Sequence, residues 1–65
     1  MFNETTFLQD LIDKKALVTI FLMNGFQLRG TITGCDQEVI QVYSDGRNQM
    51  IYKHAISTID SKFAR

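Results

Sequence analysis

The chain has 65 residues, enough for one small domain, because a chain of this length buries only about 60% of the surface that it exposes when unfolded. Seven Lys and Arg balance seven Asp and Glu, so bulk positive charge cannot carry nucleic-acid binding, and any such site must be local. One cysteine and one histidine exclude an internal disulfide and a four-ligand zinc centre of nitrogen and sulfur, which leaves self-association as the usual way to complete so small a core.

Apolar residues at helical spacing predict a helix over about residues 5–14. They are Phe7, Leu8, Leu11 and Ile12. Thr6 and Gln9 have the spacing of a capping box at the helix start, and Lys14 and Lys15 suit the negative end of the helix dipole. The segment lacks the basic and then apolar order of a signal peptide, and no run approaches the roughly 18 apolar residues of a membrane span. We therefore expect a cytoplasmic protein that does not bind membranes.

The apolar period changes to two from about residue 16 to residue 60, which predicts five short strands. Asn24-Gly25 and Asp45-Gly46 are signals for two-residue hairpin turns, and Gly30 and Gly34 mark bends or bulges in the second strand. We expect residues 1–65 to form a single domain, mainly β with one N-terminal α-helix, as a bent antiparallel SH3-like or OB-like barrel. An unpaired edge between the fourth and last strands is expected to recruit further copies into a closed ring.

Other polar and thiol groups indicate structural roles. Asp36 lies in a turn, where its carboxylate is expected to accept hydrogen bonds from backbone N–H groups, and Cys35 is expected to be a small buried residue. The chain shows no Ser-His-Asp order, no carboxylate pair typical of a catalytic cleft and no cluster of metal ligands. We expect no enzyme activity, no metal, no cofactor and no small-molecule substrate.

Two segments carry a family resemblance. Residues 52–58, YKHAIST, resemble the second Sm motif of Hfq, the bacterial Sm-like (LSm) RNA chaperone family, and residues 21–30, FLMNGFQLRG, resemble its first. The similarity runs from about Phe7 to Ile59, nearly the whole chain. The resemblance implies an Sm-like barrel, a homohexameric ring, and binding of small regulatory RNA and mRNA as single strands on both flat faces, in post-transcriptional regulation and the stress response.

The resemblance implies a distal face that binds A-rich RNA. Its residues are Phe21, Asn24, Gly25, Phe26, Gln27, Leu28, Arg29, Gln49 and Thr58. Phe21 and Phe26 would sandwich an adenine between neighbouring subunits, and Arg29 and Gln49 would read a base edge or a phosphate. Strand alternation alone favours the alternative, in which both aromatic rings belong to the core.

The resemblance also implies a pore surface that binds U-rich RNA, formed by Gln37, Glu38, Lys53 and His54. A ring would bring one Lys53 per subunit to a small opening, whereas the alternative for this Lys-His pair is a solvated turn. Further positions carried over from the family are a lateral rim at Lys14 and Lys15 and subunit contacts at Tyr52, Ile56 and Ser57.

Several positions depart from the family pattern. Glu38 replaces an aromatic residue that stacks on uracil, Glu4-Thr5 replaces a Gln-Asp pair at the pore-facing end of the helix, and Ile12-Asp13-Lys14-Lys15 replaces an arginine-rich rim. We expect no long C-terminal tail. These departures predict weakened U-rich binding, and they leave open an alternative function: a specialised Hfq paralogue with reduced RNA affinity that acts mainly through self-assembly or mixed rings.

Overall fold

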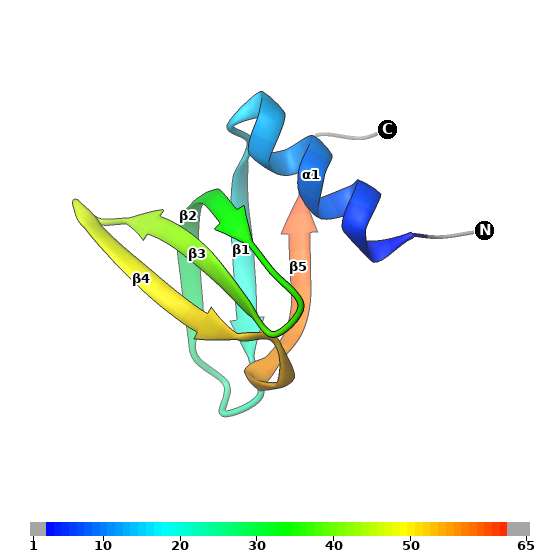
Figure 1. Ribbon diagram of the computed structural model, residues 1–65. Helices are drawn as coiled ribbons and strands as arrows, with labels where there is room; N and C mark the ends of the chain where they lie inside the picture. The colour runs from blue at the N-terminus through cyan, green and yellow to red at the C-terminus, as the bar shows by residue number, and fades with distance from the viewer. Residues whose placement is uncertain (1–2, 63–65) are drawn as a thin grey trace.

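The computed structural model describes residues 3–62, so residues 1–2 and 63–65 of the predicted domain lie outside the described part. One helix precedes five antiparallel strands in a bent sheet (Figure 1), as predicted, and the sheet has the strand order β4-β3-β2-β1-β5. The elements are α1 (Glu4–Lys14), β1 (Leu17–Leu22), β2 (Gln27–Cys35), β3 (Val39–Ser44), β4 (Arg47–Tyr52), the 3-10 turn η1 (Lys53–Ala55) and β5 (Ile56–Ser61).

Helix α1 begins with an asparagine cap. The Asn3 side chain accepts a hydrogen bond from the backbone N–H of Thr6 at 3.2 Å, which satisfies one of the free donors of the first turn. The predicted capping box is therefore wrong, because the helix starts earlier and Thr6 already lies inside it; Gln9 instead donates to Asp13 at 2.9 Å. The helix ends at Lys14. Lys15 caps it, with a left-handed φ of 52° and an N–H that donates to the carbonyl of Ile12.

The core lies between α1 and the concave side of the sheet. Leu8 and Leu11 supply the buried face of the helix, and Val18 and Ile20 supply alternate positions of β1, as the two periodicities predict. The buried apolar side chains are Leu8, Leu11, Val18, Ile20, Ile32, Ile40, Val42 and Ile51. The partly buried residues packed around them include Phe7 and Ile56, so the core extends to the start of β5.

The two predicted hairpins form, with different loops. Asp45 and Gly46 have φ values of 58° and 76° and join β3 to β4 by a two-residue turn of the type favoured in hairpins. The loop between β1 and β2 is longer than predicted and spans residues 23–26. Gly25, with a φ of 95°, donates to the carbonyl of Leu22, and the Asn24 side chain accepts from the N–H of Phe26 at 3.0 Å. These two local hydrogen bonds therefore close the loop.

Strand β2 bends where glycines predict it. The register of β2 against β3 shifts between Ile32 and Gly34, as in a β-bulge. At Gly30 the backbone of β2 approaches β3 so closely that a Cβ would collide with the carbonyl oxygen of Tyr43. The Ser44 hydroxyl, which is buried, donates to the carbonyl of Arg29 at 2.6 Å beside this contact. Close approach at Gly30 lets the sheet wrap around the core.

Strands β4 and β5 form the two edges of the sheet, as expected for an incomplete barrel. Within residues 3–62, no helix is long and apolar enough to cross a membrane. The prediction for Cys35 is wrong: its side chain is exposed, because Cys35 is the last residue of β2 and lies next to the exposed Asp36 turn.

Gly30→Ala is expected to destabilise the fold by about 1–3 kcal/mol, since the added methyl group meets backbone that cannot move without opening the sheet. Gly34→Ala is the matched control, because its added Cβ would lie 3.5 Å from the Gln41 side chain, an ordinary contact. Urea unfolding of both variants measures the difference. Equal losses of stability would contradict the role assigned to the contact at Gly30.

Candidate nucleic-acid interface

Part of the predicted distal face lies on the outer side of β1 and its two neighbours. Phe21 of β1 pairs with Gln27 of β2 on one side and with Thr58 of β5 on the other, so three members of the predicted set form one row. The neighbouring Thr19 pairs with Arg29, whose side chain is exposed. The row and Arg29 therefore form a continuous surface. It carries the half-buried ring of Phe21, the amide of Gln27, the hydroxyl of Thr58 and the guanidinium of Arg29.

Phe26 lies at the end of the β1–β2 loop with 71% of its surface exposed, so it is not a core residue of this chain. Phe21 is half-buried. The alternative in which both aromatic rings belong to the core is therefore wrong for Phe26 in the isolated chain. An aromatic ring this exposed offers a face on which a base can stack.

The structure separates two other predicted members from this surface. Leu28 packs against the core cluster, because alternation along β2 turns it away from the side that carries Gln27 and Arg29. Gln49 lies on β4, at the opposite edge of the sheet from the β5 residue Thr58. Within one chain, the predicted distal face is therefore divided between the two open edges.

The predicted pore surface is brought together around η1. Gln37, Glu38, Lys53 and His54 line one hollow of about 450 Å³ together with Tyr52. The backbone N–H of Lys53 donates to the carbonyl of Glu38 at 2.8 Å, which ties η1 to the turn between β2 and β3. The rings of Tyr52 and His54 stack with centroids 5.5 Å apart, so Tyr52, predicted as a subunit contact, also orients a pore residue.

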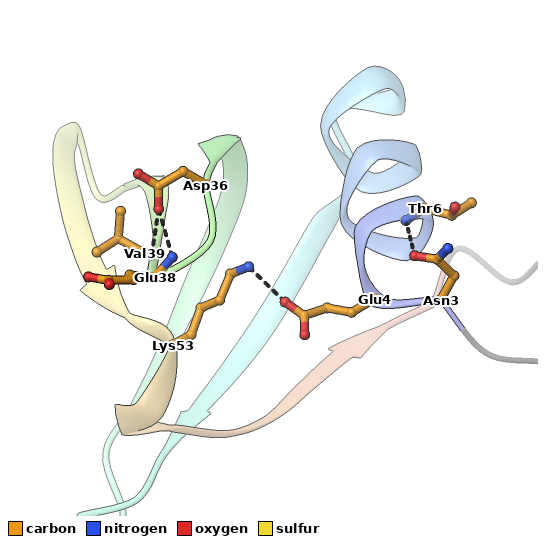
Figure 2. Close-up of polar contacts among 7 residues, drawn as sticks. All are labelled: Asn3, Glu4, Thr6, Asp36, Glu38, Val39 and Lys53. Carbon is orange, nitrogen blue, oxygen red and sulfur yellow. Dashed lines mark hydrogen bonds and ion pairs between the residues drawn. The ribbon is translucent and has the colours of Figure 1, made fainter.

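Asp36 shapes the turn that carries Gln37 and Glu38, as expected. Its carboxylate accepts hydrogen bonds from the N–H groups of Glu38 at 2.8 Å and Val39 at 2.9 Å (Figure 2). These two bonds, with a smaller contribution from the positive charge of Lys53, hold the pKa of Asp36 below its ordinary value of 3.8. The turn is therefore built around a charged carboxylate.

Lys53 forms an ion pair across the fold. Its Nζ lies 2.7 Å from Oε2 of Glu4 in the first turn of α1 (Figure 2). The hydrogen bond to Glu4 raises the pKa of Lys53 above its ordinary 10.5, so this side chain stays protonated at neutral pH. The departure from the family pattern at Glu4 indicated an altered pore surface, but the sequence pattern gave no sign of this pairing across 49 positions.

The predicted rim is richer in cations than expected. Lys14 lines a hollow of about 550 Å³ together with Arg29 and Lys62, and Asp60 contributes one opposing charge. Lys15 caps the helix beside it. Lys62 was missed because a lone lysine near the end of a chain carries no pattern. Arg29 thus lies between the outer surface of β1 and the rim.

Two of the three predicted subunit contacts lie at the start of β5. Ile56 and Ser57 line a groove of about 480 Å³ that runs between α1, β3 and β5. Phe7, Ile40 and Ile59 make much of its wall apolar. Among the described residues 3–62, no group of three or more His, Cys, Asp or Glu side chains could hold a metal ion.

Comparisons with known proteins find matches over most of this chain. A family model described as "Hfq protein" matches residues 4–64. The RNA-binding protein Hfq of Anoxybacillus flavithermus is 54% identical over 52 residues, covering 80% of this chain and 70% of that protein, and the Bacillus subtilis protein of the same name is 50% identical, covering 80% and 71%. A 1.55 Å crystal structure described as the pleiotropic translational regulator Hfq superposes with a TM-score of 0.86 at 38% identity, covering 88% of this chain and 95% of that one.

Asp36→Asn is expected to lower the free energy of unfolding near neutral pH, because an amide oxygen is a weaker acceptor than a carboxylate. Since the pKa of Asp36 is lowered on folding, its contribution is complete above about pH 4 and is lost as the pH falls through the folded pKa below 3.8. The gap between parent and variant should therefore shrink in acid. Urea unfolding from pH 6 to strongly acidic pH measures it.

Asp45→Asn, in the β3–β4 turn, is the matched control because it removes the same charge from an exposed turn that also accommodates asparagine. Parallel curves for the parent and Asp36→Asn over the whole pH range would contradict the role of the Asp36 carboxylate.

Proposed function

Because this chain belongs to the Hfq family of RNA-binding chaperones, we propose that it forms a homohexameric ring that binds single-stranded RNA on two faces. Its partners are small regulatory RNAs and mRNAs, and its setting is the cytoplasm. By holding two RNA segments at once the ring raises their effective concentration, which is how it would act in post-transcriptional regulation and the stress response. The single observation that carries this proposal is the division of the distal face between two open sheet edges.

Ring formation is supported by what the edges expose. Strands β4 and β5 each have one unpaired side, and such an edge is a template for another strand. The apolar groove beside β5 offers a second copy further surface to bury. Pairing of β4 from one subunit with β5 from the next places Gln49 of the first near Thr58 of the second. A shared interface thus completes the divided distal face.

A-rich RNA is the ligand that suits the distal face. Stacking on an aromatic ring contributes about 1–3 kcal/mol per base, and the exposed Phe26 is positioned for it beside the Phe21 row. Gln27 and Arg29 add amide and guanidinium donors for base edges and phosphates. Since Arg29 also lines the rim hollow with Lys14 and Lys62, the RNA path continues outward from this face.

U-rich RNA is proposed to bind the pore surface more weakly. Lys53, His54 and Gln37 supply donors, and a ring multiplies each of them around one opening. Glu38 lines the same hollow and places a carboxylate where a stacking ring would help, so attraction and repulsion oppose each other. The relatives described as RNA-binding proteins support this function over the alternative of a ring subunit that has lost RNA affinity.

The mass in solution is expected to be that of six 7.5 kDa chains by light scattering at micromolar concentration. Ser57→Arg should lower the mass, because Ser57 is exposed in the proposed interface and the added side chain would obstruct the neighbouring subunit. Leu17→Arg adds the same charge at a residue that is 59% exposed and outside the groove, and should leave the mass unchanged. A monomeric parent would refute the ring.

Phe26→Ala is expected to weaken binding of A-rich RNA by about 1–3 kcal/mol for each base that stacks on it, with the ring intact. Titration of a short labelled A-rich strand, alongside a mass measurement, is the test. Tyr43→Ala is the control, since Tyr43 is an exposed aromatic residue outside the proposed distal face. Unchanged A-rich binding by Phe26→Ala would show that the distal face is assigned incorrectly.

A further inference from the structure

The ion pair between Glu4 and Lys53 joins the start of α1 to the η1 turn. Glu4 lies in the first turn of α1, where a negative charge suits the helix dipole, and Lys53 opens the η1 turn of the proposed pore surface. Their side chains meet at 2.7 Å. Both side chains line one hollow, together with Asp36, Gln37 and Cys35.

This pairing occupies the charged donor that the pore surface would offer to RNA. An ammonium group has only three N–H donors, and here one of them is directed at a carboxylate. Asp36 adds a second negative charge near Lys53, and the Glu38 side chain lines the adjoining hollow. A phosphate or a uracil oxygen that approaches Lys53 must therefore displace Glu4 or bind with the Glu4 carboxylate next to it.

Exposure indicates which partner would move. The Glu4 side chain is 60% exposed, whereas the Lys53 side chain is only 24% exposed. Lys53 is thus the more fixed partner of the pair, and Glu4 is the partner with more freedom to turn into solvent. Withdrawal of Glu4 into solvent would uncover Lys53 without any change in the backbone.

We propose that Glu4 is a specificity-determining residue of the pore surface: by pairing with Lys53 it disfavours U-rich RNA at the pore and leaves the A-rich distal face as the stronger site. This inference rests on the proposed function. It differs from the effect of Glu38, which removes a stacking platform, because Glu4 acts by occupying a donor that is present.

The test is Glu4→Gln, which keeps the size of the side chain and removes its charge. Short labelled U-rich and A-rich strands are titrated against parent and variant rings of equal mass. The pair is only partly buried and is screened by solvent, so its removal should strengthen U-rich binding about two- to fivefold for each subunit that the RNA engages. The salt slope of U-rich binding should steepen by about 0.7 for each phosphate that a freed Lys53 neutralises. A-rich binding should not change.

Two further variants separate pairing from net charge. Asp45→Asn removes one negative charge in the β3–β4 turn, at the far end of β4 from Lys53, and should leave U-rich binding unchanged. In a Lys53→Gln background, Glu4→Gln should no longer strengthen U-rich binding, because there is no ammonium to release. Thermal melting of each ring confirms that the comparisons are made on folded protein.

The outcomes are decisive in either direction. The inference is overturned if Glu4→Gln fails to strengthen U-rich binding, if Asp45→Asn strengthens it equally, or if the gain persists in full without Lys53. A parent that binds A-rich RNA while Glu4→Gln has no effect refutes the role of Glu4 alone. A parent and a Glu4→Gln variant that bind neither RNA refute the proposed function as well.

Discussion

The close approach of β2 and β3 at Gly30 is the constraint on which the rest of the structure depends. A sheet of five short strands can enclose a core of this size only if it bends, and the absence of a side chain at Gly30 allows the backbone of β2 to meet the carbonyl of Tyr43. The bend carries the turn after β2 toward the start of α1. Asp36, Lys53 and Glu4 consequently line one hollow, although they come from three separate segments (Figure 2).

Local sequence patterns predicted most of the fold because the elements are locally determined. Helical and alternating periodicities located α1 and β1, and Asp45-Gly46 located a turn whose positive φ values only a few residues adopt readily. The capping box at Thr6 failed because the Asn3 side chain caps the helix and Thr6 lies inside it. Cys35 was misplaced because burial of the last residue of a strand depends on what packs around it, which no local pattern encodes.

The candidate site was predicted less completely than the fold, because contacts between distant segments bring its residues together and no local pattern encodes them. The family resemblance located Lys53, His54 and Gln37, and the structure gathers them in one hollow. The partner of Lys53 comes from the other end of the chain, and Lys62 joins Lys14 and Arg29 only through the pairing of β5 with β1. Charge balance over the whole chain conceals this arrangement, since a net charge of zero results from local groups of opposite sign.

The link between the β1–β2 loop and η1 has a consequence for how the two proposed RNA faces relate. The N–H of Met23 donates to the carbonyl of Ala55 at 2.8 Å, so the loop that ends at Phe26 and the turn that begins at Lys53 share a backbone hydrogen bond. The β1–β2 loop and η1 thus support each other directly at this point. A substitution that distorts either segment therefore disturbs the supporting frame of both, and binding defects measured on one face require a control on the other.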